Sequence, residues 1–123
     1  MKNTFLLILL ITSTILHAQV RSEMGFSGNS MKAADLGSKG MILFSKQNTS
    51  FGVAMFSSDG SKLWEQTIEF KKAFWYSGCA SPDGTTFYFS VQGKGMAKGS
   101  VDSYTIGRIQ VADGTMETKE HAK

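Results

Sequence analysis

Cysteine and histidine are scarce in this chain of 123 residues, and their scarcity excludes several kinds of chemistry. The single cysteine, Cys79, leaves no partner for an intramolecular disulfide. Its neighbours, WYSGCAS, are typical of a strand interior, so we expect Cys79 to be a small buried residue and not a reactive thiol. Beyond the first 18 residues the only histidine is His121, close to the C-terminal end of the chain. A nucleophile paired with a histidine base is therefore not expected, and the sequence predicts a non-catalytic protein.

Long apolar runs are absent after residue 18. The chain begins MKNTFLLILLITSTILHAQV, in which Lys2 precedes the apolar run Phe5 to Ile11 and the small residue Ala18 follows. This layout predicts a secretory signal peptide over residues 1–18, cleaved after Ala18. A membrane anchor is the alternative, but a span needs roughly 20 apolar residues and this run is shorter. We expect an exported protein, secreted or periplasmic, with no membrane span after cleavage.

A strong excess of one charge is also missing. Beyond residue 18 there are 12 Lys and Arg against 10 Asp and Glu, which gives a net charge of +2. Nucleic-acid binding needs a concentrated basic patch, so no nucleic-acid partner is expected. The local clusters are Lys71 with Lys72, and Lys94 with Lys98. These indicate ordinary solvated surface, and Lys94 and Lys98 are the candidates for contact with an anionic partner.

What the sequence contains from residue 40 onward is a series of short apolar or alternating segments separated by turn signals. Such a pattern predicts an all-β fold. The expected strands cover residues 40–45, 50–57, 61–70, 73–80, 85–93, 102–111 and 115–120. The only proline, Pro82, falls between two of these segments, where it does not interrupt a strand.

Alternation with a period of two assigns an inward face to two of the strands. The inward residues are Trp64, Ile68 and Phe70 in the segment 61–70, and Phe87, Phe89 and Val91 in the segment 85–93. An aromatic cluster spans the preceding junction and consists of Phe70, Phe74, Trp75 and Tyr76. Aromatic residues of a β protein usually pack between sheets, so we expect this cluster in the core and not at a ligand site.

Three Asp-Gly pairs lie between expected strands: Asp59-Gly60, Asp83-Gly84 and Asp113-Gly114. Asp accepts hydrogen bonds from its own turn and Gly adopts positive φ without strain, so these pairs predict tight reversals. Calcium would need several oxygens within one loop, so the three carboxylates predict no metal site. The loop GKGMAKGS lacks the order of a phosphate-binding loop, and no cofactor is expected.

Residues 19–39 are polar and rich in Gly and Ser, which is typical of an extended lead-in. Within them Ser30 is placed to cap one helical turn from Met31 to Leu36, with Gly37 as its end. The expected organisation is a signal peptide over 1–18, the lead-in over 19–39, a β domain over 40–120 and a tail over 121–123.

The segment from Ser77 to Glu120 resembles one blade of a TolB-type β-propeller, a WD-like repeat. CASPDGTTFYFS, YTIGRIQVADGT and METKE match its Ser-Pro-Asp-Gly corner with the aromatic strand, its Ile/Val strand and its outer strand, in order. Residues 40–70 resemble the last three strands of a preceding blade. The resemblance implies an antiparallel meander of two blade-like units, about 40–70 and 74–120; a small β-sandwich or half-barrel is the alternative.

Propellers close from about four to eight blades, and repeat units cannot bury their faces alone. Three outcomes therefore stay open: a fragment of a longer propeller, a small stand-alone fold, or assembly with copies of itself, with open sheet edges as contacts. The resemblance implies an exported, non-catalytic module that binds a protein or glycan of the cell envelope. The alternative is the non-catalytic propeller portion of a secreted prolyl-peptidase-like hydrolase.

Overall fold

The computed structural model describes residues 23–26, 30–94 and 102–122. The expected signal peptide lies outside the described residues, and so do Lys98 and most of the loop 93–100. Within the described residues the chain forms eight strands and one short 3₁₀ helix, η1 (Gly37–Lys39).

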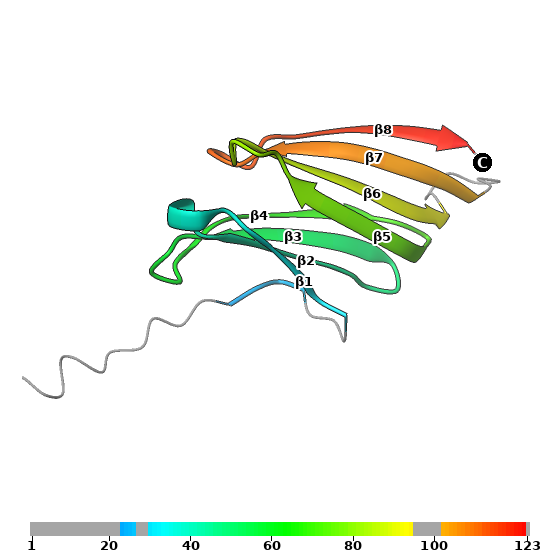
Figure 1. Cartoon of the computed structure of the whole chain (residues 1–123). Coiled ribbons are helices and arrows are strands. Elements are labelled where there is room, and N and C mark those ends of the chain that lie inside the picture. The colour runs from blue at the N-terminus through cyan, green and yellow to red at the C-terminus, as the bar shows by residue number, and fades with distance from the viewer. Residues whose placement is uncertain (1–22, 27–29, 95–101, 123) are drawn as a thin grey trace, which may run out of the picture.

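The strands form two four-stranded antiparallel sheets, each a simple meander (Figure 1). The first sheet contains, in spatial order, β1 (Lys32–Asp35), β2 (Met41–Lys46), β3 (Ser50–Phe56) and β4 (Lys62–Glu69). The second contains β5 (Lys72–Ala80), β6 (Thr86–Lys94), β7 (Asp102–Gln110) and β8 (Met116–Ala122). This confirms the prediction of an all-β antiparallel fold with two blade-like sheets.

Strand β1 lies where the sequence predicted a helical turn, so that prediction is wrong. Its register with β2 runs from Lys32 opposite Phe44 to Asp35 opposite Met41. One isolated helical turn has no tertiary partner, whereas β2 offers a full row of backbone donors and acceptors at its edge. The first sheet therefore has four strands, where the resemblance had suggested three.

The two sheets stack face to face around one apolar core. Its buried members are Ile42, Phe44, Phe51, Val53, Met55, Phe70, Ala73, Tyr76, Phe87, Phe89, Val91, Ile109 and Val111. Rings from the two sheets meet directly: the centroids of Phe51 and Phe89 are 5.1 Å apart, and those of Phe44 and Phe87 are 5.0 Å apart. The inward faces predicted for β4 and β6 are confirmed, since their predicted residues are buried in this core or pack against it.

The sheets run in the same strand order and are joined along both sides. Strand β5 contacts β1, β2 and β3, and β8 is the strand of the second sheet farthest from the first sheet (Figure 1). On the other side, Trp64 Nε1 donates to the carbonyl oxygen of Val111 at 2.8 Å, and Gln66 Nε2 donates to that of Gly114 at 2.9 Å. These contacts leave one face of each sheet directed away from the core.

Candidate functional site

The three Asp-Gly pairs lie at the same end of the two sheets, in the connections β3–β4, β5–β6 and β7–β8. Gly60, Gly84 and Gly114 have backbone φ values of 87°, 67° and 75°, which residues other than glycine rarely adopt. At the central corner the amide of Gly84 donates to the carbonyl of Ser81 at 2.9 Å, and Pro82 occupies the first inner position of the turn.

The aspartates of these corners are engaged by their own turns. Asp83 Oδ1 accepts from Ser81 Oγ at 2.6 Å, from Thr85 Oγ1 at 2.8 Å and from the Thr85 amide at 3.1 Å. These bonds, that of Ser81 first, lower the pKa of Asp83 from 3.8 to about 2. Asp83 therefore serves as the hydrogen-bond acceptor that holds its own turn.

The other two corners repeat this arrangement. Asp59 accepts from the hydroxyl of Ser57 and, at 2.9 Å, from the amide of Ser61, and its pKa is also lowered to about 2, chiefly by Ser57. Asp113 accepts from the Thr115 amide at 2.8 Å, which is the main cause of its lowered pKa. In the described part of the chain, no three side chains of His, Cys, Asp or Glu are grouped to hold a metal ion.

A lysine that the sequence reasoning missed joins the two sheets at this end. Lys39 Nζ, from η1 of the first sheet's β1–β2 connection, donates to the carbonyl oxygens of Asp83 and Gly84 at 3.1 and 3.4 Å. Lys39 belongs to no charge cluster, and no local signal marks it. The central corner is therefore a contact between the sheets as well as a turn.

Of the two candidate lysines, only Lys94 is among the described residues. It ends β6 at the opposite end of the sheet, in register with Lys72 and Asp102. Its carbonyl oxygen accepts a hydrogen bond from the Lys71 amide at 2.8 Å. The clusters that lie apart in the sequence, Lys71-Lys72 and Lys94, thus share one end of the second sheet.

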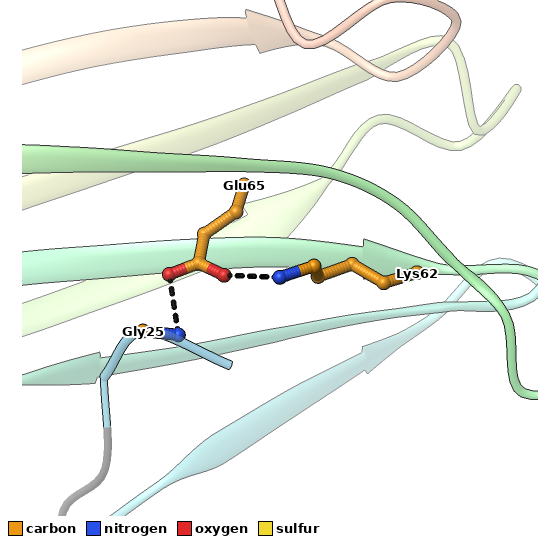
Figure 2. A network of polar contacts seen from close by, with 3 residues as sticks. All are labelled: Gly25, Lys62 and Glu65. Atoms are coloured by element: carbon orange, nitrogen blue, oxygen red, sulfur yellow. Dashed lines mark hydrogen bonds and ion pairs between the residues drawn. The ribbon is translucent and has the colours of Figure 1, made fainter. Parts of the chain in front are cut away.

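The chain's own lead-in covers the centre of the outer face of the first sheet. Leu63 stays exposed, and an open hollow of about 440 Å³ remains around Met41 and Leu43. Phe26 packs so tightly over Gly52 that a Cβ on Gly52 would lie 2.4 Å from the ring, and Ala54 beside it is fully buried. Figure 2 shows the polar part of this contact, in which Glu65 accepts from the Gly25 amide at 2.8 Å and pairs with Lys62 at 2.9 Å.

The outer face of the second sheet, by contrast, is open to solvent. We use the name "open face" for its three rows of cross-strand neighbours, each written from β5 to β8. They are Cys79, Tyr88, Arg108 and Glu117; Ser77, Ser90, Ile106 and Lys119; and Trp75, Gln92, Tyr104 and His121. Its large side chains remain accessible, with exposed fractions of 51% for Trp75, 50% for Ile106 and 47% for Tyr88.

Two sequence predictions fail on this face. Cys79, expected in the interior, is exposed opposite Tyr88. In the aromatic cluster, Phe70 and Tyr76 are buried as predicted, but Phe74 and Trp75 are exposed. A register shift between Ala73 and Trp75 interrupts the alternation of β5, so that the neighbouring side chains of Phe74 and Trp75 are both exposed.

The open face is almost flat around Tyr88. A shallow hollow of about 270 Å³ on one side is lined by Ile106, Arg108, Glu117 and Lys119, and one of about 230 Å³ on the other side is lined by Ser77, Cys79 and Ser90. Glu117 Oε2 accepts from Arg108 Nη2 at 2.8 Å and from Nε at 3.0 Å. Both hollows are open, so this surface fits a broad partner better than a small molecule.

No protein-family model, curated protein or solved structure matches the chain. Among residues 23–26, 30–94 and 102–122, no helix has the length and apolar character needed to cross a bilayer. The candidate site is therefore defined by the geometry of the open face.

Proposed function

We propose that the chain is an exported, non-catalytic, β-propeller-like binding module that contacts a macromolecule of the cell envelope through the open face. The observation that carries this proposal is the set of half-exposed Trp75, Tyr88 and Ile106 on one side of one sheet. Contiguous exposed apolar surface on a soluble domain marks an interaction site, and Trp and Tyr are enriched where binding energy concentrates.

The polar chemistry of the face supports binding and not catalysis. The oppositely charged Arg108 and Glu117 lie in an outer row of the face and are paired with each other at 2.8 Å. The corner aspartates are at an end of the sheets, and each accepts hydrogen bonds from its own turn. An apolar centre with a charged rim is the usual composition of a protein interface.

The propeller-like character rests on the Ser-Pro-Asp-Gly corner and on the two meander sheets that stack in the same order. Export rests on the N-terminal segment MKNTFLLILLITSTILHA. The propeller-like fold, the export and the partner in the envelope are therefore all parts of the proposal.

Site-specific photocross-linking in the source cell tests the contact surface. A benzophenone amino acid is placed at position 106 of the full chain and, as a matched control, at position 63, where Leu63 is 56% exposed on β4. The proposal predicts a discrete adduct from position 106 and none from position 63. No adduct from position 106, or equal adducts from both positions, would refute it.

A further inference from the structure

We propose that the molecule seated on the open face is a second copy of this chain, related to the first by a two-fold axis along the row Ser77, Ser90, Ile106 and Lys119. This inference rests on the proposed function, because it names the occupant of the same face. The two copies would stack sheet on sheet, with each strand antiparallel to its counterpart in the other copy.

The composition of the open face differs from that of a permanently buried sheet face. The stacked inner faces place Phe, Ile, Val and Met side chains at the core, with no charged side chain among the core residues. The open face mixes Tyr88, Ile106 and Tyr104 with Arg108 and Glu117. A chain with such a face is stable in water as a monomer. Burial of the apolar side chains against a partner still provides favourable free energy, as expected of an interface that can separate.

The size of the face is sufficient for a small specific dimer. Four strands about 4.8 Å apart, paired over seven residues of about 3.3 Å each, give about 450 Å² in projection. Two such faces, with the relief of their side chains, bury on the order of 1,000 Å², where specific interfaces begin. The expected dimer is therefore weak and depends on concentration.

The rows of the face complement themselves about the proposed axis. Rotation about the middle row keeps each strand over its own copy and exchanges the two outer rows. Ile106 then meets Ile106 of the other copy, and Arg108 lies over Tyr104, where a guanidinium stacks favourably on an aromatic ring. Glu117 comes opposite His121. The face carries charges of both signs. Lys119 of the middle row meets its own copy, but it lies on the edge strand β8, where long lysine side chains reach solvent and diverge.

The sheet edges are less suitable for self-association than the open face. Strand β8 carries Glu117, Lys119 and Glu120, and such charged side chains discourage pairing with another strand. At the other outer edge, β1 has only four residues. The exposed side chains of Trp75, Tyr88, Tyr104 and Ile106 lie on the face of the second sheet, so contact through that face covers them and contact through an edge does not.

Sedimentation equilibrium of the mature full-length protein over about 1 to 500 μM tests the dimer. Wild type is expected to show a concentration-dependent dimer. Ile106→Glu should weaken it about tenfold or more, because it places a charge at the centre of the contact, whereas the matched variant Leu63→Glu should dimerise as wild type does. A wild-type monomer throughout, or a dimer equally strong in Ile106→Glu, would overturn the inference.

Thiol cross-linking tests the position of the axis. In a Cys79→Ser background, Ile106→Cys should give a covalent dimer with a short bis-maleimide, since residue 106 meets its own copy across stacked sheets about 10 Å apart, which a disulfide does not span. Leu63→Cys in the same background should stay monomeric. Equal trapping of the two variants, or none from Ile106→Cys, would contradict the two-fold arrangement.

The photocross-linking experiment separates this inference from the proposed function. An adduct from position 106 with twice the mass of the chain supports both. An adduct with a different envelope protein or a glycan keeps the proposed function and refutes the second copy as occupant. No adduct from position 106 refutes both.

Discussion

The two sheets share strand order and connection type, but their outer faces are completed differently. On the first sheet, β3 points Gly52 and Ala54 outward, and Phe26 of the lead-in fills the space above them. On the second sheet, the central strands β6 and β7 point Tyr88 and Ile106 outward, and both side chains are about half exposed. Small outward residues create room for a covering segment, whereas large amphipathic ones leave a surface for another molecule.

The two sheets also differ in the face on which their glycines lie. In the second sheet Gly78 and Gly107 face the core, where rings from β6 cover them. A Cβ on Gly107 would lie 2.1 Å from Phe89, and one on Gly78 would lie 2.5 Å from Phe87. The second sheet thus uses its glycines to bring aromatic rings into the shared core, and the first sheet uses Gly52 to bind its lead-in.

The largest loss of stability is expected from a substitution in the core between the two sheets. Phe51 is fully buried and its ring contacts those of Phe44, Tyr76 and Phe89. Phe51→Ala should lower the free energy of unfolding by about 3–5 kcal/mol, since it removes a ring and leaves a cavity. Urea unfolding followed by circular dichroism measures this. A loss no greater than that of Phe26→Ala would mean that the inter-sheet layer is not the main core.

A smaller effect is expected from exposing the covered outer face. Phe26→Ala should cost about 2 kcal/mol, the value of burying one large apolar side chain. Dye binding to exposed apolar surface should rise, because Ala54 and Phe56 lose their cover. Gly52→Ala, which pushes the ring away, is the independent test, and the double variant should cost little more than either single one. Fully additive losses would show that Phe26 and Gly52 act separately.

A still smaller effect is expected at the corner that joins the sheets. Gly84→Val should cost about 1 kcal/mol or more, because a β-branched side chain resists a φ of 67°. Space is not the cause, since the nearest atom to a Cβ there is Lys39 Nζ at 3.6 Å. Lys94→Ala, at the other end of the sheet, is the control and should leave the melting temperature unchanged. An unchanged melting temperature in Gly84→Val would contradict strain at this turn.

The sequence predicted the fold where local chemistry decides it and missed it where tertiary contacts do. The alternation of Phe87, Phe89 and Val91 is enough to assign the buried face of β6. Strand β1 was missed because its pairing depends on the free edge of β2, and Ser30 and Gly37 resemble helix ends locally. The role of Phe26 was missed because residues 19–39 have no periodicity.

The candidate site was harder to predict for a related reason. Burial of Cys79 and Trp75 was inferred from an apolar segment, but an apolar strand does not reveal whether both of its faces are covered. The alternation in β6 did place Tyr88 away from the core. Recognition of a contact surface needs the neighbouring strands, since Tyr88, Ile106 and Trp75 become one face only through the register of the sheet.

The smallest effect is expected from substitutions at the corner aspartates, which change stability in acid and allow the corners of the two sheets to be compared. Asp59 in the first sheet and Asp83 in the second both have a folded pKa of about 2, below the usual 3.8. Stability from such groups is full above about pH 4 and is lost as the pH falls toward 2, because protonation removes the acceptor. Melting curves from pH 5 to pH 2 should fall less steeply in Asp59→Asn and in Asp83→Asn.

The two variants should flatten the acid limb of the melting profile to a similar extent. Only Asp83 has a lysine, Lys39, at its corner, but the main cause of both lowered pKa values is a hydroxyl of the same turn, from Ser57 or Ser81. Short-range hydrogen bonds are not screened by salt, so 0.5 M NaCl should leave the difference between each variant and the wild type unchanged. A difference that shrinks with salt only for Asp83→Asn would show instead that Lys39, and thus the contact between the sheets, sets the charge of that corner.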